Sequence, residues 1–242
     1  MRMLLTAMNC PKGDLVSNLA GHRDLLADGR SAGCRLVLLP EMSLTGYQPS
    51  AAIGLEHPAV QELVAATGAG PALGLGMVEQ PADGGKPYIT HVVAAAGRII
   101  SVHRKAGLGE DEHADFRPGE PSGLICVVGL ATSIAVCAEI GTAPPYELRS
   151  HLVLGPAAPG LYGPRRVTDQ DWQRGFDWWR ETTLASADRF LRPGQWPAVS
   201  TQAGATDDED FPGWAALIGS GGRIVAELAD WREDSLVVDL PE

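Results

Sequence analysis

Three residues with reactive side chains stand at the ends of separate apolar runs in this chain. Cys137, Glu41 and Lys105 each directly follow a largely apolar segment of five to seven residues. Such runs predict β-strands, and open α/β sheets bind their ligands beyond the carboxyl ends of the strands. The sequence therefore predicts a thiol, a carboxylate and an ammonium group at one sheet edge. This set of groups is suited to thiol-based acyl chemistry.

Each of the three residues also has a purely structural explanation. A cysteine in an apolar run is usually a core residue, a glutamate after such a run can cap a helix, and a lysine is usually solvated. Their coincidence at equivalent positions favours function, because three ionisable groups at a buried sheet edge are costly unless they interact. A thiol with a pKa of about 8.5 is mostly protonated at neutral pH and needs a base before it can attack.

The elements that must position these residues alternate between strands and helices in the first part of the chain. Apolar periodicity predicts a β-α-β-α opening with a strand over 2–8, a helix over 14–29, a strand over 35–39 and a helix over 59–66. Further strands are predicted over 73–78, 89–96, 98–104, 123–128, 132–136, 152–154, 198–202, 214–218, 223–228 and 236–240, with a long helix within 171–190. Hairpin turns are predicted at Gly97, at Gly129 and over 219–222.

This order of elements predicts an α/β fold. We expect a four-layer α-β-β-α sandwich with two mixed sheets and external helices, built as a single domain over residues 1–242. The 45% hydrophobic content is ample for a large core. The Pro- and Gly-rich stretch over 156–168 is expected to be a long loop that borders the pocket.

Several motifs around the three residues resemble the nitrilase or carbon-nitrogen hydrolase superfamily. Their order and separations match the Glu, Lys and Cys motifs of that family over nearly the whole chain. The stretches that carry the resemblance are LVLLPEMSLTGY (36–47), HRKAGL (103–108), EHADFRPG (112–119) and VCAEI (136–140).

The resemblance implies a role for each site residue. The Cys137 thiolate would attack an amide or nitrile carbon, with Glu41 as general base. Lys105 and the Ala138 backbone N–H would stabilise the oxyanion. Tyr47 would contact the substrate, and specificity would lie in the loops over 47–56 and 156–168.

A second glutamate is also implied, and the sequence leaves its identity open. Glu110, Asp111, Glu112 and Asp115 crowd one loop. The distance to Phe116 and the Pro-Gly pair favours Glu112, which would hold Lys105 and the substrate nitrogen; Glu110 is the alternative. A solvated acidic loop is the structural explanation of the same residues.

Two alternatives to this hypothesis remain at the level of sequence. His103 and His113 lie close to the motifs and could serve as the base of a Cys-His pair. The segment between Cys137 and the strand at 152 is also too short for the full helix that the family usually has there. The second functional hypothesis is therefore a retired relative that binds a small metabolite without turnover.

Composition narrows the class of partner. The net charge of −11 and the scarcity of clustered Lys and Arg argue against nucleic-acid binding. No apolar run approaches the roughly 20 residues that span a bilayer, and the N-terminus lacks a secretory signal, so we expect no membrane association and a cytoplasmic location. The expected partner is a small amide substrate, amidase action being favoured over nitrilase action, and homo-oligomer formation stays open.

The four cysteines show no CxxC spacing and no histidine pairing typical of zinc. We therefore predict no metal and no cofactor, and we expect Cys10, Cys34 and Cys126 to be buried as small hydrophobic residues. Trp172, Trp178 and Trp179 fall on one predicted helix and are expected in the core or an interface. Arg165 or Arg166 could meet a substrate carboxylate, although solvation is the expected fate of both.

Overall fold

A computed structural model describes residues 1–161, 169–206 and 208–241 of the chain. The strands are β1 (Arg2–Met8), β2 (Leu36–Leu38), β3 (Ala72–Glu79), β4 (Tyr88–Ala95), β5 (Arg98–Arg104), β6 (Ile125–Val127), β7 (Leu130–Ile134), β8 (Leu152–Ala157), β9 (Trp196–Ala205), β10 (Asp210–Pro212), β11 (Trp214–Ile218), β12 (Ile224–Ala229) and β13 (Asp234–Asp239). The α-helices are α1 (Leu15–Ser31), α2 (Pro58–Ala66), α3 (Pro144–Glu147) and α4 (Asp169–Phe190).

The strands form two groups with different neighbours. One group runs in the order β5-β4-β3-β2-β1, with β13 antiparallel to β1, and the other in the order β9-β8-β7-β6, with β11 and β12 added to β9. A short parallel pairing of β1 with β9, at Ala7 with Thr201 and Met8 with Gln202, joins the groups. The two mixed sheets predicted from the sequence are therefore hydrogen-bonded into one continuous path.

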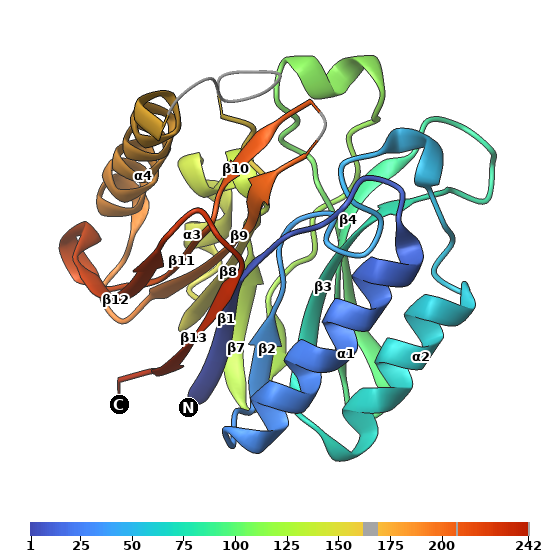
Figure 1. Ribbon diagram of the computed structural model, residues 1–242. Helices are drawn as coiled ribbons and strands as arrows, with labels where there is room; N and C mark the ends of the chain where they lie inside the picture. The colour runs from blue at the N-terminus through green and yellow to red at the C-terminus, as the bar shows by residue number, and fades with distance from the viewer. Residues whose placement is uncertain (162–168, 207, 242) are drawn as a thin grey trace.

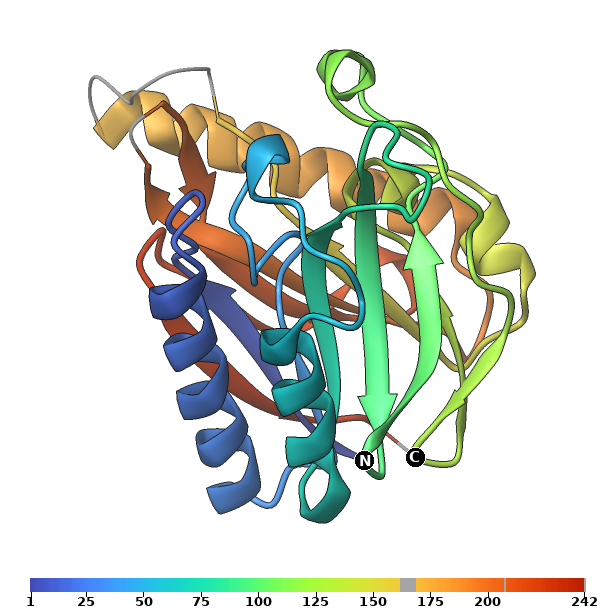
Figure 2. The same ribbon diagram turned by 90° about the vertical axis from the view of Figure 1, so that its right-hand side faces the viewer.

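The strands and helices are arranged in layers, with α1 and α2 on one side and α4 on the other (Figures 1 and 2). Three clusters of buried apolar residues lie between these layers. Alternation along β1 sends Leu5 into a central cluster that draws on both groups of strands, and Leu4 into a second cluster beside α1 and α2. The third cluster contains Trp172 and Trp179 of α4 on the far side of β8 and β9. The α/β class and the helix-sheet-sheet-helix layering follow from this partition.

The predicted elements agree with the structure apart from their bounds and the omission of several short elements. The sequence missed β10, the short α3 and the 3₁₀ helices. The predicted turns at Gly97 and Gly129 have φ values of 75° and 87°, which glycine adopts without strain. These turns connect β4 to β5 and β6 to β7, the two hairpins predicted from the apolar pattern.

Several sequence expectations require correction. Cys126 is exposed on an edge strand, whereas Cys10 and Cys34 are buried as predicted. Trp178 is 62% exposed, because it lies on the opposite face of α4 from its buried neighbours. The loop predicted from Pro156 starts later, since β8 continues to Ala157 and pairs with β9.

Positions 162–168 of that loop lie outside the described residues, and so do the candidate anion contacts Arg165 and Arg166. Among the helices that the structure does describe, none has the length and the hydropathy needed to cross a lipid bilayer.

Candidate active site

Glu41 follows β2 and is almost completely buried, with 1% of its surface exposed. Its Oε2 accepts a hydrogen bond from the Ala158 backbone N–H at 2.9 Å, and its backbone carbonyl accepts one from Gln202 Nε2 at 2.8 Å. The glycine at position 76 on β3 lets the backbone around Glu41 approach closely, because a Cβ there would collide with the backbone of Pro40 and Met42. Three segments that are remote in the chain therefore fix the position of Glu41, and one of them contacts its carboxylate.

Lys105 directly follows β5 and is equally buried. Its Nζ donates to Glu41 Oε1 at 2.8 Å and to Glu112 Oε1 at 2.7 Å. Burial acts to lower the pKa of this ammonium group, but the negative charges of Glu41 and Glu112 outweigh burial and raise the pKa above its ordinary value. Lys105 is therefore a stable cation shared between two buried carboxylates.

The structure distinguishes between the candidate second glutamates. Glu112 lies on the 3₁₀ helix Asp111–Ala114 and contacts Lys105, whereas Glu110 is exposed on the outside of the same loop. Glu112 Oε2 accepts from the Gly109 N–H at 2.6 Å, and its Oε1 accepts from the Tyr47 hydroxyl at 3.3 Å. Of the four acidic residues in the loop, Glu112 is the one that the fold brings to Lys105.

Tyr47 lies beside this cluster. Its ring packs edge-on against Phe116 with centroids 5.9 Å apart, and the Lys12 ammonium lies 5.5 Å from the ring centroid. Burial, followed by the charges of Glu112 and Glu41, raises the pKa of the phenol, so the hydroxyl stays protonated and donates.

Cys137 begins the 3₁₀ helix Cys137–Gly141 and has a φ of 48°, a strained value for a residue with a Cβ. Cys137 is half-buried and Ala138 is exposed. The Ala138 N–H belongs to the second residue of this short helix, and the first N–H groups of a helix have no intrahelical acceptor. This turn can therefore present both a thiol and a backbone donor.

The charges around Cys137 determine its resting state. Burial is the largest influence and raises the thiol pKa, Glu41 raises it further, and Lys105 lowers it by less. The pKa of Glu41 is also raised, first by burial, with Lys105 opposing the shift. The thiol is consequently protonated at neutral pH, and a carboxylate that can accept its proton lies in the same buried cluster.

The histidine alternative finds no support in the geometry. Both ring nitrogens of His103 are engaged, Nδ1 with Ser122 and Nε2 with Glu139 Oε2 at 2.8 Å. His113 is exposed. The sequence reasoning missed Ala158, Gln202 and Glu139 as contacts in and around the site. Only Glu139 had a local signal, its place two residues after the cysteine.

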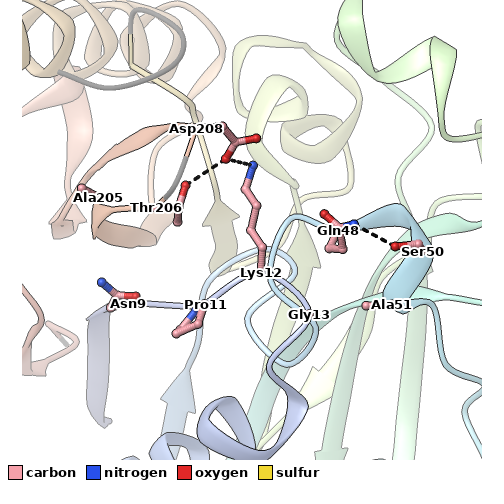
Figure 3. Close-up of a pocket in the computed structure, with 10 residues that line it drawn as sticks. All are labelled: Asn9, Pro11, Lys12, Gly13, Gln48, Ser50, Ala51, Ala205, Thr206 and Asp208. Carbon is pink, nitrogen blue, oxygen red and sulfur yellow. Dashed lines mark hydrogen bonds and ion pairs between the residues drawn. The ribbon is translucent and has the colours of Figure 1, made fainter.

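A polar hollow lies next to Tyr47. A cavity of about 920 Å³ is lined by residues from the loops after β1 and β2 and from the β9–β10 connection, namely Asn9, Pro11, Lys12, Gly13, Gln48, Ser50, Ala51, Ala205, Thr206 and Asp208 (Figure 3). Lys12, Gln48 and Asp208 also line a neighbouring cavity of about 440 Å³ that reaches Tyr47. Lys12 bridges Asp208 and Glu209 at 2.7 and 2.8 Å.

The sandwich fold, with a Glu-Lys-Cys cluster at the strand ends, has the features of a carbon-nitrogen hydrolase. A sequence profile described as carbon-nitrogen hydrolase matches residues 5–242, and the chain belongs to this family.

Among solved structures, the chain is similar to an amidase from Nesterenkonia sp. AN1, with 26% identity and a TM-score of 0.81 over all of this chain and 93% of that one. A glutamate-to-glutamine variant of that amidase, 25% identical with a TM-score of 0.80 over 100% and 90% of the two chains, carries the acetamide moiety of fluoroacetamide on its active-site cysteine.

A curated relative, the glutamine-dependent NAD(+) synthetase of Rhodobacter capsulatus, is 28% identical over 252 residues. The match covers 99% of this chain and 43% of that protein. The chain therefore spans less than half the length of this relative.

Proposed function

We propose that this chain is an amidase that hydrolyses a small linear amide through a thioester on Cys137. The observation that carries the proposal is the cluster of Glu41, Lys105 and Glu112, with Nζ 2.8 and 2.7 Å from the two carboxylates, beside the strained turn of Cys137. The similarity to an amidase structure with an adduct on its cysteine supports the same chemistry.

The first half of the reaction forms the acyl-enzyme. Glu41 takes the proton of the Cys137 thiol as Sγ bonds to the amide carbon, because the raised thiol pKa leaves little preformed thiolate. The carbonyl oxygen gains negative charge, which Lys105 and the Ala138 N–H stabilise. Collapse of this adduct breaks the C–N bond, and Glu41 returns the proton to the nitrogen, which leaves as ammonia or an amine.

The second half of the reaction uses the same groups. Glu41 removes a proton from a water molecule as the water oxygen attacks the thioester carbon. The C–S bond then breaks, Glu41 returns the proton to Sγ, and the product leaves as a carboxylic acid. Glu112 holds Lys105 and accepts a hydrogen bond from Tyr47, which orients both for the amide. The two carboxylates thus have separate roles, proton transfer for Glu41 and positioning for Glu112.

Ammonia release across a panel of acetamide, propionamide, glutamine and the matching nitriles tests the proposal. We expect release from at least one amide, loss of release in Cys137→Ala, and unchanged release in Cys126→Ala, which removes an exposed cysteine remote from the cluster. Intact mass spectrometry of Glu41→Gln should detect an acyl adduct on Cys137 whose mass identifies the acyl half. Binding of amides without ammonia release in the wild type would favour the retired-relative hypothesis.

Glutamine belongs in the panel for a specific reason. The Rhodobacter capsulatus relative is named as glutamine-dependent, and almost all of this chain matches part of it. Faster ammonia release from glutamine than from acetamide would favour a glutamine amide hydrolase as the second candidate function.

A further inference from the structure

Glu139 is a buried carboxylate that the proposed reaction does not use. It is 5% exposed, and its two oxygens accept four hydrogen bonds. Oε2 accepts from the Val136 N–H at 2.9 Å and from His103 Nε2 at 2.8 Å. Oε1 accepts from the N–H groups of Ala106 and Gly107 at 2.9 and 3.2 Å.

These four donors come from both sides of the proposed catalytic cluster. Val136 directly precedes Cys137, His103 precedes Lys105 by two residues, and Ala106 directly follows Lys105. One carboxylate therefore connects the turn of the nucleophile to the end of β5. We propose that Glu139 is a positioning residue, which fixes the position of the Cys137 thiol relative to the Lys105 ammonium group.

The donors define the state of the network. The Ser122 backbone N–H donates to His103 Nδ1 at 3.2 Å, so this nitrogen accepts and Nε2 carries the proton that points at Glu139. Burial acts to raise the pKa of Glu139, but the hydrogen bonds from His103, Val136 and Ala106 outweigh it and lower the pKa. Glu139 is therefore an ionised acceptor, and a neutral amide cannot replace it.

The backbone strain at Cys137 explains why the hydrogen bond between Val136 and Glu139 matters for the position of the thiol. A non-glycine residue at a φ of 48° is strained and persists only where its surroundings hold it. The hydrogen bond at Val136 fixes the backbone immediately before this strained residue. Without it, the turn can relax and move the thiol relative to Lys105, and misplacement by about 1 Å can cost a factor of about 100 in rate.

The test is Glu139→Gln, which has nearly the same shape. The –NH₂ group of the glutamine side chain takes the place of either Oε1 or Oε2. In both cases it faces two N–H donors, so the network loses two of its four hydrogen bonds. This inference rests on the proposed function, so the first measurement is kcat and KM on the amide that the wild type hydrolyses. We expect kcat to fall about 10- to 100-fold with KM changed less than about threefold.

Glu79→Gln is the matched control. Glu79 is 4% exposed and also accepts several hydrogen bonds, from Arg104 and Thr90. Arg104 points to the opposite face of β5 from His103, because neighbouring strand residues alternate. We expect this variant to lose stability comparably but to keep kcat within about threefold of the wild type. Equal losses of kcat in the two variants would overturn the proposal.

A second measurement does not depend on turnover. The rate of iodoacetamide alkylation of Cys137, relative to the exposed Cys126 of the same molecule, reports the placement of the thiol. We expect Glu139→Gln to change this ratio by at least about threefold and Glu79→Gln to leave it unchanged. An unchanged ratio in Glu139→Gln overturns the positioning role, whereas absence of amide hydrolysis in the wild type overturns only the proposed function.

If Glu139→Gln does not fold, His103→Leu removes one of the four donors and leaves the three backbone donors in place. It should change kcat and the alkylation ratio in the same sense by a smaller factor. Wild-type values of both quantities in a folded His103→Leu, together with a non-folding Glu139→Gln, would assign the network to stability alone.

Discussion

Replacing Lys105 with methionine probes the buried charge cluster most directly. Methionine keeps the length and apolar body of the lysine but removes the cation that Glu41 and Glu112 share at 2.8 and 2.7 Å. Breaking a buried ion pair by removing one partner typically costs about 3–5 kcal/mol, because the remaining charge is left without compensation. Here two carboxylates lose the same partner.

Protonation limits this cost and makes it depend on pH. Neutralising one carboxyl with an ordinary pKa of 4.5 costs about 3.4 kcal/mol at pH 7 and about 0.7 kcal/mol at pH 5, at about 1.36 kcal/mol per pH unit. In the folded variant the pKa of the orphaned carboxyl is raised further, so the folded state binds more protons than the unfolded state. Stability therefore falls as pH rises above 4.5.

Urea unfolding of Lys105→Met and the wild type at pH 5 and pH 7 measures the effect. The difference in unfolding free energy between the two proteins should be about 3–5 kcal/mol at pH 7 and smaller by about 2–3 kcal/mol at pH 5. Adding Glu112→Gln should recover part of the loss at pH 7, since one of the two orphaned charges is then absent. A difference that is the same at both pH values would refute the reasoning.

Three further predictions concern the groups around this cluster. Gly76→Ala should destabilise the protein by at least about 2 kcal/mol in thermal or urea unfolding, because the new Cβ meets the Met42 backbone. Gly54→Ala is the control, since its Cβ would lie in open space, and equal effects of the two substitutions would contradict the close approach at Gly76. Tyr47→Phe should lower kcat/KM about fivefold on the best amide by removing one hydrogen bond, and an unchanged value would remove Tyr47 from the site. Because burial raises the pKa of Glu41, and only its ionised form accepts a proton, kcat/KM should fall with decreasing pH through an apparent pKa above 4.5; activity that persists below this value would exclude Glu41 as the base.

The positions of the candidate groups along the chain were accessible from the sequence. Apolar runs ending in Glu41, Lys105 and Cys137 predicted strands, and β2, β5 and β7 occupy those runs. Strand patterns are local, because alternation and turn residues act over a few neighbouring positions. The same local logic located the hairpin turn at Gly97, and the fold class followed from the order of the elements.

The tertiary structure alone decided how these groups interact. The backbone donor to the Glu41 carboxylate is the N–H of Ala158, 117 residues away in the chain, and no local pattern marks a backbone amide for that role. The choice of Glu112 over its acidic neighbours required knowing which side chain faces Lys105. The protonated state of Cys137 depends on burial, which is a property of all the packed layers together. The donors around Glu139 come from two segments of the chain that only the fold brings together. The sequence determines which reactive groups stand at strand ends. The distances between these groups and their burial away from water are set only when segments that are remote in the chain pack together.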